Sequence, residues 1–292
     1  MDRLLAAGKG SGSMNRKEIK LIALDLDGTT LTSEKVMTER TKAAIRAALE
    51  KGIEVVACSG RSRNGMMPFV SAFPGMHYMI ASNGASALEL ASGKLIYGAY
   101  IETGRAADLL DKILTLGVMG DIYYGGGAFS DYRNYRYITQ TENGFPKWFV
   151  EYFISNRKPV EDLPGMLRAG KIPYVEKVTV SFDDMSLRAK AFELMRDEAG
   201  LSIVAGNPFN MEISQEDATK GKALTALAAA LGIDMKNVMA VGDTGNDVSM
   251  IEAAGLGVAM GNADAQIRTL ADVETATNDE DGAALAIERF AL

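Results

Sequence analysis

The sequence predicts an α/β protein with a Rossmann-like parallel-sheet core and an inserted α+β cap domain. Three observations predict this fold: an apolar run near the N-terminus ends abruptly in Asp-Leu-Asp-Gly-Thr, strand and helix patterns then alternate to about residue 85, and the same alternation returns after about residue 214. Strand, helix and strand in this order favour parallel pairing with right-handed crossovers.

The first core segment contains three predicted strands. Residues 19–24 are almost purely apolar, as expected of a strand that is buried on both faces and ends in a loop at its carboxyl edge. A helix with alanines at helical spacing follows and ends before Gly52, where a left-handed residue is favoured. The second strand, residues 53–57, comes next, and a third apolar run at 77–81 ends in Ser-Asn-Gly.

The pattern then changes and later returns. Short alternating runs, many tyrosines and three consecutive glycines at 125–127 indicate a separate α+β unit. An alanine-rich helix at 220–231 and strands at 238–241 and 256–259 restore the first pattern. The predicted segments are a vector-derived leader at 1–13, a core domain at 14–85 and 214–292, and a cap domain at 86–213 that sets substrate specificity.

Composition and charge exclude several function classes. The 292 residues carry a formal charge of −7, which repels a phosphodiester backbone and anionic lipid, so neither nucleic acid nor a membrane is an expected partner. The single cysteine, Cys58, cannot form an internal disulfide, and the single histidine, His77, excludes a site that needs two imidazoles. We expect a cytoplasmic protein, and the sequence leaves its oligomeric state open.

Polar residues follow three of the predicted strands at the point where each strand ends. In open parallel sheets, ligands bind outside the carboxyl ends of the strands. Carboxylates gathered there repel one another unless a cation lies among them, and oxygen-only ligands suit Mg²⁺. A single aspartate after a strand caps a loop about as often as it binds a metal. Two spaced pairs of aspartates beside glycine favour a metal-binding site. The residues are Asp25 with Asp27, Ser59, and Asp243 with Asn246 and Asp247.

Four segments carry a resemblance to a known family. Asp-Leu-Asp-Gly-Thr-Thr-Leu at 25–31, Ser59, Lys220 and Gly-Asp-Thr-Gly-Asn-Asp at 242–247 resemble the four motifs of haloacid dehalogenase-like hydrolases. Fuller strings at 82–85, at 220–224 and at 278–282 are similar to the Cof-type phosphatase branch of that superfamily. The resemblance extends over both core segments. In the insert, only the length and the general sequence pattern are similar.

The resemblance implies a magnesium-dependent phosphatase that works through an aspartyl-phosphate. Asp25 would attack phosphorus, and Asp27 would protonate the departing alcohol and then deprotonate the attacking water. The carboxylates of Asp25 and Asp243 and the main-chain carbonyl of Asp27 would bind the metal. A carboxylate approaching a phosphate is resisted by about 4 kcal/mol per charge pair at 4 Å and an effective dielectric near 20, and Mg²⁺ with Lys220 would remove this resistance.

The remaining implied roles concern phosphate and substrate. The hydroxyl of Ser59, the amide of Gly60 and the ammonium of Lys220 would bind the phosphoryl oxygens. Asn246 would touch the substrate, and Asp247 would orient the metal shell or the lysine. Turn and helix-capping roles are the alternative for Asn246 and Asp247. The nearby Lys222 is interpreted as a solvated helix residue.

The insert separates the second and third motifs. In this family, an insert at that position forms an α/β cap domain that covers the active site. Members of the branch act on small phosphorylated metabolites, often sugar phosphates. Polar and aromatic cap residues are candidates for recognising the leaving group. For each of them alone, an ordinary structural role is the stronger interpretation. They are Tyr123, Tyr124, Asp131, Arg133, Tyr135 and Arg136.

Two other functions stay open. A phosphomannomutase-like phosphomutase shares the cap position and both aspartates of the first motif. A catalytically silent metabolite-binding protein on the same scaffold is the second, although the presence of Asp25, Asp27, Lys220 and Asp243 argues against it. A cysteine phosphatase is excluded, because Asn64 stands where the loop after Cys58 would need an arginine.

Overall fold

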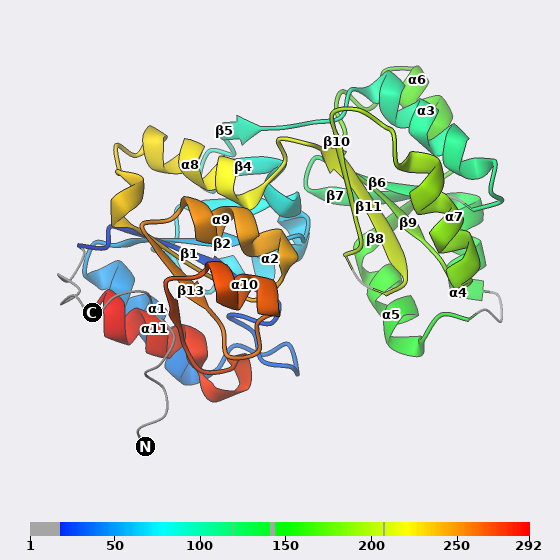
Figure 1. Ribbon diagram of the computed structural model, residues 1–292. Coiled ribbons are helices and arrows are strands. Elements are labelled where there is room, and N and C mark those ends of the chain that lie inside the picture. The colour runs from blue at the N-terminus through cyan, green and yellow to red at the C-terminus, as the bar shows by residue number, and fades with distance from the viewer. Residues whose placement is uncertain (1–17, 119, 141–143, 207) are drawn as a thin grey trace.

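The computed structural model describes residues 18–118, 120–140, 144–206 and 208–292, so the predicted leader lies outside the described residues. Two sheets, each with its own helices, form two units that lie side by side (Figure 1). Among the described residues, none of the helices combines the length and the apolar character needed to cross a membrane.

The larger sheet forms the core unit and has eight strands in the order β14-β13-β12-β1-β2-β3-β4-β5. The six strands from β14 to β3 are parallel, which confirms the predicted parallel-sheet core. Their bounds are β1 Leu21–Asp25, β2 Glu54–Cys58, β3 Tyr78–Ala81, β12 Val238–Gly242, β13 Leu256–Ala259 and β14 Val273–Glu274. Because β1 pairs with both β2 and β12, the two halves of the core meet at its centre.

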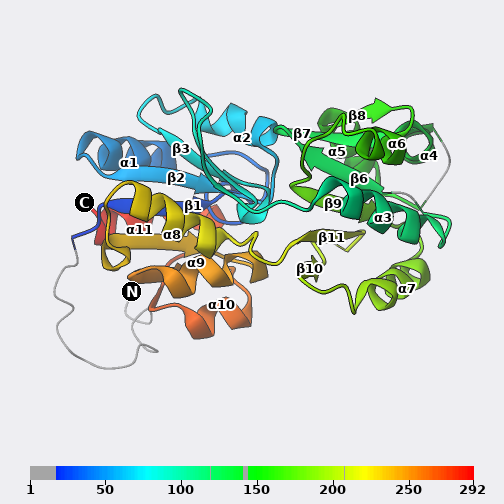
Figure 2. The ribbon, with the colours of Figure 1, turned by 90° about the horizontal axis from the view of Figure 1, so that it is seen from above.

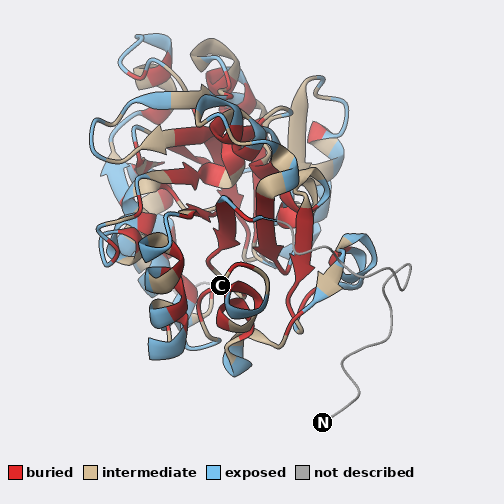
Figure 3. Cartoon of the chain, turned by 90° about the vertical axis from the view of Figure 1, so that its left-hand side faces the viewer, coloured by how far each residue is buried: buried red, intermediate tan, exposed pale blue. Residues whose placement is uncertain are grey.

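Helices cover both faces of the core sheet (Figure 2). Helices α1 and α11 pack together on one face, and α8, α9 and α10 on the other. The strands between them are buried while the outer helix surfaces are exposed (Figure 3), which explains why the strand sequences are continuously apolar. The core helices are α1 Glu39–Glu50, α2 Arg63–Val70, α8 Lys220–Ala230, α9 Val248–Ala253, α10 Ala265–Leu270 and α11 Gly282–Phe290.

A hairpin extends the core sheet beyond the predicted domain boundary. Strands β4 (Ser86–Glu89) and β5 (Leu95–Gly98) pair antiparallel with β3 and with each other, so residues 86–98 belong to the core sheet rather than to the insert. At the other boundary, residue 214 lies inside the last strand of the second sheet. The division into core and cap stays a prediction. The sheets place its first boundary after residue 98 and its second after residue 215, both later in the sequence than predicted.

The second sheet has six strands in the order β10-β11-β9-β6-β7-β8, and it forms the unit that we call the cap. Its pairs are antiparallel except β7 with β8. The strands are β6 Gly120–Tyr124, β7 Gly127–Asp131, β8 Arg157–Val160, β9 Lys177–Ser181, β10 Leu201–Val204 and β11 Asn210–Gln215. The helices are α3 Thr103–Leu114, α4 Tyr132–Gln140, α5 Lys147–Asn156, α6 Leu163–Arg168 and α7 Met185–Met195.

The two faces of the cap sheet differ in chemistry. Alternation along β9 and β11 places Val178, Val180 and Ile213 on one face, where they pack in an apolar cluster with residues of α3, α6 and α7. The same alternation places Lys177 and Glu212 on the other face, which is polar and yet buried. Lys177 donates to the loop that follows β2 of the core, and Glu212 accepts from the loop that follows β3. The polar face of the cap therefore covers the carboxyl edge of the core sheet.

Candidate active site

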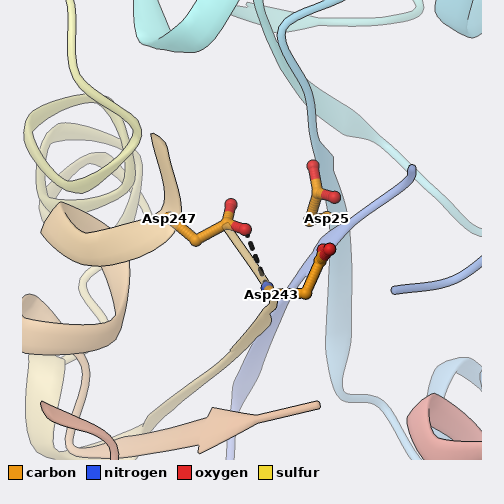
Figure 4. A group of neighbouring side chains, drawn as sticks. All are labelled: Asp25, Asp243 and Asp247. Carbon is orange, nitrogen blue, oxygen red and sulfur yellow. Dashed lines mark hydrogen bonds between the residues drawn. The ribbon is translucent and has the colours of Figure 1, made fainter. Parts of the chain in front are cut away.

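Three aspartates, one at the end of β1 and two in the segment that follows β12, meet at the carboxyl edge of the core sheet (Figure 4). Asp25 is the last residue of β1, Asp243 directly follows β12, and Asp247 ends the short helix η3 (Gly245–Asp247). All three are buried, and one carboxylate oxygen from each lies within 4.8 Å of the others. The juxtaposition arises because β1 and β12 are parallel neighbours, so their carboxyl ends coincide.

Local hydrogen bonds fix the orientation of Asp247 and Asp243. The main-chain N–H groups of Asp243 and Thr244 donate to Asp247 Oδ2 at 2.9 and 3.1 Å. The hydroxyl of Thr29 donates to Asp243 Oδ1 at 2.9 Å. Asp247 thus caps the η3 turn through Oδ2, and its Oδ1 accepts from Lys220.

Lys220 lies fully buried beside this cluster at the first position of α8. Its Nζ donates to Asp25 Oδ1 and to Asp247 Oδ1, both at 2.6 Å. Lys222, in contrast, is exposed and pairs with Asp217 on the helix surface. The structure therefore brings Lys220 to the aspartates and leaves Lys222 in solvent, as the sequence predicts.

The cluster contains more negative than positive charge. Burial raises the pKa of Asp25 well above its ordinary value, and the neighbouring Asp247 and Asp243 add to this against the opposing effect of Lys220. Burial and the charge of Asp247 raise the pKa of Asp243 to about 6. Burial alone would lower the pKa of Lys220, but the charges of Asp247 and Asp25 outweigh it and raise that pKa. An additional cation would stabilise the ionised carboxylates.

The donor set fits a small divalent cation. In the part of the chain that the structure describes, the possible metal-ligand atoms that converge here are carboxylate oxygens, and such hard oxygen ligands suit Mg²⁺. Gly28, whose φ is +88°, lies so close to Asp243 that a Cβ atom there would overlap the carboxylate. The predicted metal ligands Asp25 and Asp243 therefore come together, Asp247 joins them, and the side chain of Asp27 does not.

Asp27 instead forms ion pairs at the edge of the cluster. Arg61 donates through Nε to Oδ2 at 2.7 Å and through Nη2 to Oδ1 at 2.8 Å, and Lys35 Nζ lies 3.0 Å from Oδ1. Burial would raise the pKa of Asp27, but Arg61 and Lys35 outweigh it and lower that pKa to about 2. Asp27 is therefore ionised. Sequence reasoning missed Arg61 as its partner, although Arg61 directly follows the predicted phosphate-binding pair at 59–60.

The predicted substrate-binding residues surround one asparagine. Ser59 is buried just after β2, and its main-chain oxygen accepts from the N–H of Asn83 at 3.0 Å. Gly60 lies against the side chain of Asn83, where a Cβ atom would come within 2.6 Å of Asn83 Oδ1. Asn246 Nδ2 donates to the same Oδ1 at 3.1 Å. Asn83 lies in the motif at 82–85, and the sequence predicts no separate role for it.

Charged cap residues reach this region and were not predicted. Lys177 Nζ donates to the main-chain oxygen of Gly60 and to Glu212 Oε2, both at 3.0 Å. Glu176 Oε2 accepts from the hydroxyl of Ser82 at 2.7 Å. Polar residues at alternate positions of β9 and β11 were the available signal, because they indicate a buried face that is not apolar.

The six cap candidates named from the sequence have mostly structural contacts. Tyr123 lies on the polar face, with its ring centre 4.5 Å from Lys177 Nζ. Arg133 pairs with Asp131, which also accepts from the N–H of Leu163 on the α6 side. The other three also contact cap residues: Tyr124 stacks edge-on against Tyr174, Tyr135 packs near Phe153, and Arg136 donates to Gln140.

Comparison with known proteins identifies the family. The family model for haloacid dehalogenase-like hydrolases matches residues 22–287. Phosphatase YwpJ of Bacillus subtilis is 32% identical over 288 residues, covering 91% of this chain and 98% of that protein. The 5-amino-6-(5-phospho-D-ribitylamino)uracil phosphatase YcsE of Bacillus subtilis is also 32% identical, covering 94% and 97%.

A solved structure has the same architecture. The crystal structure of a haloacid dehalogenase-like hydrolase from Bacteroides thetaiotaomicron matches with a TM-score of 0.79 and 27% identity, covering 93% of this chain and 99% of that one. The fold and the sequence thus agree over nearly the whole length. The chain belongs to the haloacid dehalogenase-like hydrolases, and the predictions of this family, of its Cof-type branch and of a phosphomonoester hydrolase are confirmed.

Proposed function

We propose that this protein is a cytoplasmic, magnesium-dependent phosphatase that hydrolyses small phosphorylated metabolites, sugar phosphates foremost, through an aspartyl-phosphate on Asp25. The observation that carries the proposal is the buried contact of Lys220 with Asp25, beside Asp243 and Asp247. The name of YcsE, a phosphatase of a small phosphorylated ribityl compound, supports the substrate class.

Asp25 and Asp243, with the main-chain carbonyl of Asp27, would hold Mg²⁺. When bound, this ion supplies positive charge that offsets the negative charge of the nucleophile and of the phosphoryl oxygens. Asp247 holds Lys220 in place, and Lys220 in turn fixes one oxygen of Asp25. A nucleophile held by a buried ion pair loses little orientational freedom when it reacts. Asp25 then attacks phosphorus, and the bond from phosphorus to the leaving oxygen breaks.

The loop after β2 lies beside the nucleophile and would bind the phosphoryl group. The hydroxyl of Ser59 and the main-chain N–H of Gly60 are the donors that we assign to phosphoryl oxygens, together with the ammonium of Lys220. Asn246 approaches from the loop after β12 and is assigned to the substrate. The cap covers this edge, which limits the access of water to the reacting group.

Asp27 would move the protons. It must first hold a proton to give to the leaving alcohol, and afterwards it must be ionised to take one from the attacking water. Its ion pairs with Arg61 and Lys35 favour the ionised form, which is the form required by the second step. Arg61 therefore has to release Asp27 before the first step, when a leaving group arrives.

Hydrolysis of p-nitrophenyl phosphate tests the proposal. We expect release of p-nitrophenol with Mg²⁺, loss of release with excess chelator, and a decrease of at least about 1000-fold in Asp25→Asn. Asp197→Asn removes the same charge from an exposed cap position and is expected to retain wild-type rates. Metal-independent turnover that survives in Asp25→Asn would contradict the proposal.

A panel of phosphorylated sugars, nucleotides and cofactors would then identify the substrate class. Hexose 1-phosphates in this panel also test the phosphomutase alternative, because isomerisation faster than phosphate release would favour a mutase. Binding without turnover across the whole panel would favour the catalytically silent alternative.

A further inference from the structure

The turn that follows β3 has an uncommon backbone conformation. Ser82, Asn83 and Gly84 form the short helix η1, and their φ angles are +53°, +60° and +96°. Successive left-handed residues are disfavoured for L-amino acids, and non-glycine residues keep this conformation only where the surroundings hold it. Such positions concentrate at functional sites, which directs attention to what holds this turn.

The backbone of the turn is held by two segments assigned to phosphate binding, the loop after β2 and the start of α8. The N–H of Ser82 donates to the main-chain oxygen of Arg61 at 2.9 Å, and the N–H of Asn83 donates to that of Ser59 at 3.0 Å. Gly84 lies directly against the backbone between Thr219 and Lys220, where no side chain would fit. The turn therefore contacts both the loop after β2 and the start of α8.

The side chain of Asn83 joins the cap to the core. Its Nδ2 donates to Glu212 Oε2 of the cap at 3.0 Å, while its Oδ1 accepts from Asn246 Nδ2 of the core at 3.1 Å. Glu212 also accepts from Lys177, which donates to the main-chain oxygen of Gly60. The amide plane of Asn83 is thus fixed from both sides, by one cap group and one core group.

We propose that Asn83 is a positioning residue that couples the position of the cap on the core to the orientation of Asn246 and of the loop at 59–61. Its functional meaning rests on the proposed function, because that function assigns substrate binding to those residues. A cap that moves away removes the acceptor at Glu212, and the amide of Asn83 is then free to rotate and to release Asn246. The substrate-binding groups are fully ordered only when the cap is in place.

The substitution Asn83→Asp tests this coupling with little change in shape. Aspartate tolerates the left-handed conformation much as asparagine does. It keeps an oxygen toward Asn246 but places a second carboxylate oxygen against Glu212 instead of a donor. We expect kcat for p-nitrophenyl phosphate and for glucose 6-phosphate to fall about tenfold or more, with the melting temperature close to that of wild type.

A second substitution distinguishes coupling from simple damage. In Asn83→Asp combined with Glu212→Gln, the glutamine amide can donate to the new carboxylate, and Lys177 can pair with that carboxylate in place of residue 212. The bond across the interface is then rebuilt with reversed polarity. We expect the double variant to regain most of the lost kcat. Gln140→Glu, which adds a charge at an exposed cap position and keeps the oxygen that accepts from Arg136, is the control and is expected to behave like wild type.

Amide hydrogen exchange provides a readout that does not depend on turnover. We expect faster exchange at 59–61 and 243–247 in Asn83→Asp and a return to wild-type rates in the double variant. Unchanged exchange in Asn83→Asp, or equal exchange in the single and double variants, would overturn the coupling whether or not the protein hydrolyses any phosphate. Absence of hydrolysis by the wild type with the expected exchange pattern would instead contradict only the proposed function.

Discussion

Lys220 donates a hydrogen bond of 2.6 Å to Asp25 across 195 positions of the sequence. Both side chains are buried, and the same ammonium group lies 2.6 Å from Asp247. The bond connects the first strand of the core to the first helix after the cap. It therefore forms only when the chain that follows the insert has returned to the same sheet edge.

Replacing this lysine leaves buried carboxylates without their cation. We expect Lys220→Met to lower the free energy of unfolding by about 3–5 kcal/mol, as when one partner of a buried ion pair is removed, and to abolish hydrolysis. Urea unfolding monitored by circular dichroism measures the first effect. The matched control is Lys222→Met, at an exposed position of the same helix, and it is expected to resemble wild type. Equal stability of the two variants would contradict this account of Lys220.

The stability of the metal-free protein is expected to depend on pH in an unusual direction. The pKa of Asp243 is raised to about 6 in the folded state, so its contribution to stability is complete below the unfolded pKa near 4 and is lost as the pH rises through 6. With chelator present, the free energy of unfolding should therefore fall between pH 4 and pH 7, by about 1–3 kcal/mol.

Mg²⁺ should remove this fall, because a bound cation stabilises the ionised carboxylates. The measurement compares denaturant unfolding of wild type and Asp243→Asn across this pH range, with chelator and with Mg²⁺. In chelator we expect the two proteins to diverge as the pH rises above about 4, because only wild type loses stability there. With Mg²⁺ we expect only wild type to gain stability, because Asp243→Asn removes a proposed metal ligand. Parallel curves in chelator at every pH would show that the titration of Asp243 is not linked to folding.

The sequence predicted the centre of the site because its signals are local. A strand buried on both faces must be apolar throughout, so the end of each apolar run marks the sheet edge, and Asp25 and Asp243 had to lie there. The hairpin at 86–98 was misplaced because its short alternating strands have the same pattern whether they extend the core sheet or the cap sheet. Periodicity also shows which residues share a face of β9, but it does not show what that face contacts.

Contacts between units were beyond such reasoning. The pairing of Arg61 with Asp27 depends on side-chain directions in two loops, and neither loop has a periodic pattern. The contact of Asn83 with Glu212 depends on how the cap lies on the core. The motif at 82–85 was nevertheless visible in the sequence, and the left-handed backbone at Asn83 gives a physical reason for an Asn-Gly pair there.

Arg61 is expected to control the protonation of Asp27. Its two hydrogen bonds, together with Lys35, hold the pKa of Asp27 at about 2. In Arg61→Met this pKa should rise toward the ordinary value of an aspartate, whereas Arg63→Met should leave it unchanged. Carbon-13 NMR titration of the carboxyl signal, assigned with Asp27→Asn, measures both. An unaltered pKa in Arg61→Met would mean that other groups keep Asp27 ionised.

The different roles proposed for Asp25 and Asp27 predict that an aspartyl-phosphate intermediate can be trapped. In Asp27→Asn, residue 27 can no longer take a proton from water, so hydrolysis of an aspartyl-phosphate should slow strongly. p-Nitrophenol leaves without help from an acid, so formation of the intermediate should continue. With Mg²⁺ we expect a burst of one p-nitrophenol per protein followed by slow turnover.

Mass spectrometry of peptides from Asp27→Asn, quenched in acid after incubation with p-nitrophenyl phosphate and Mg²⁺, tests nucleophilic attack by Asp25 most directly. The predicted result is one added phosphoryl group on the peptide that contains residue 25, located on Asp25 and absent when Asp25→Asn is also introduced. A phosphoryl group on any other residue, or p-nitrophenol release at a steady rate with no labelled peptide, would contradict the account.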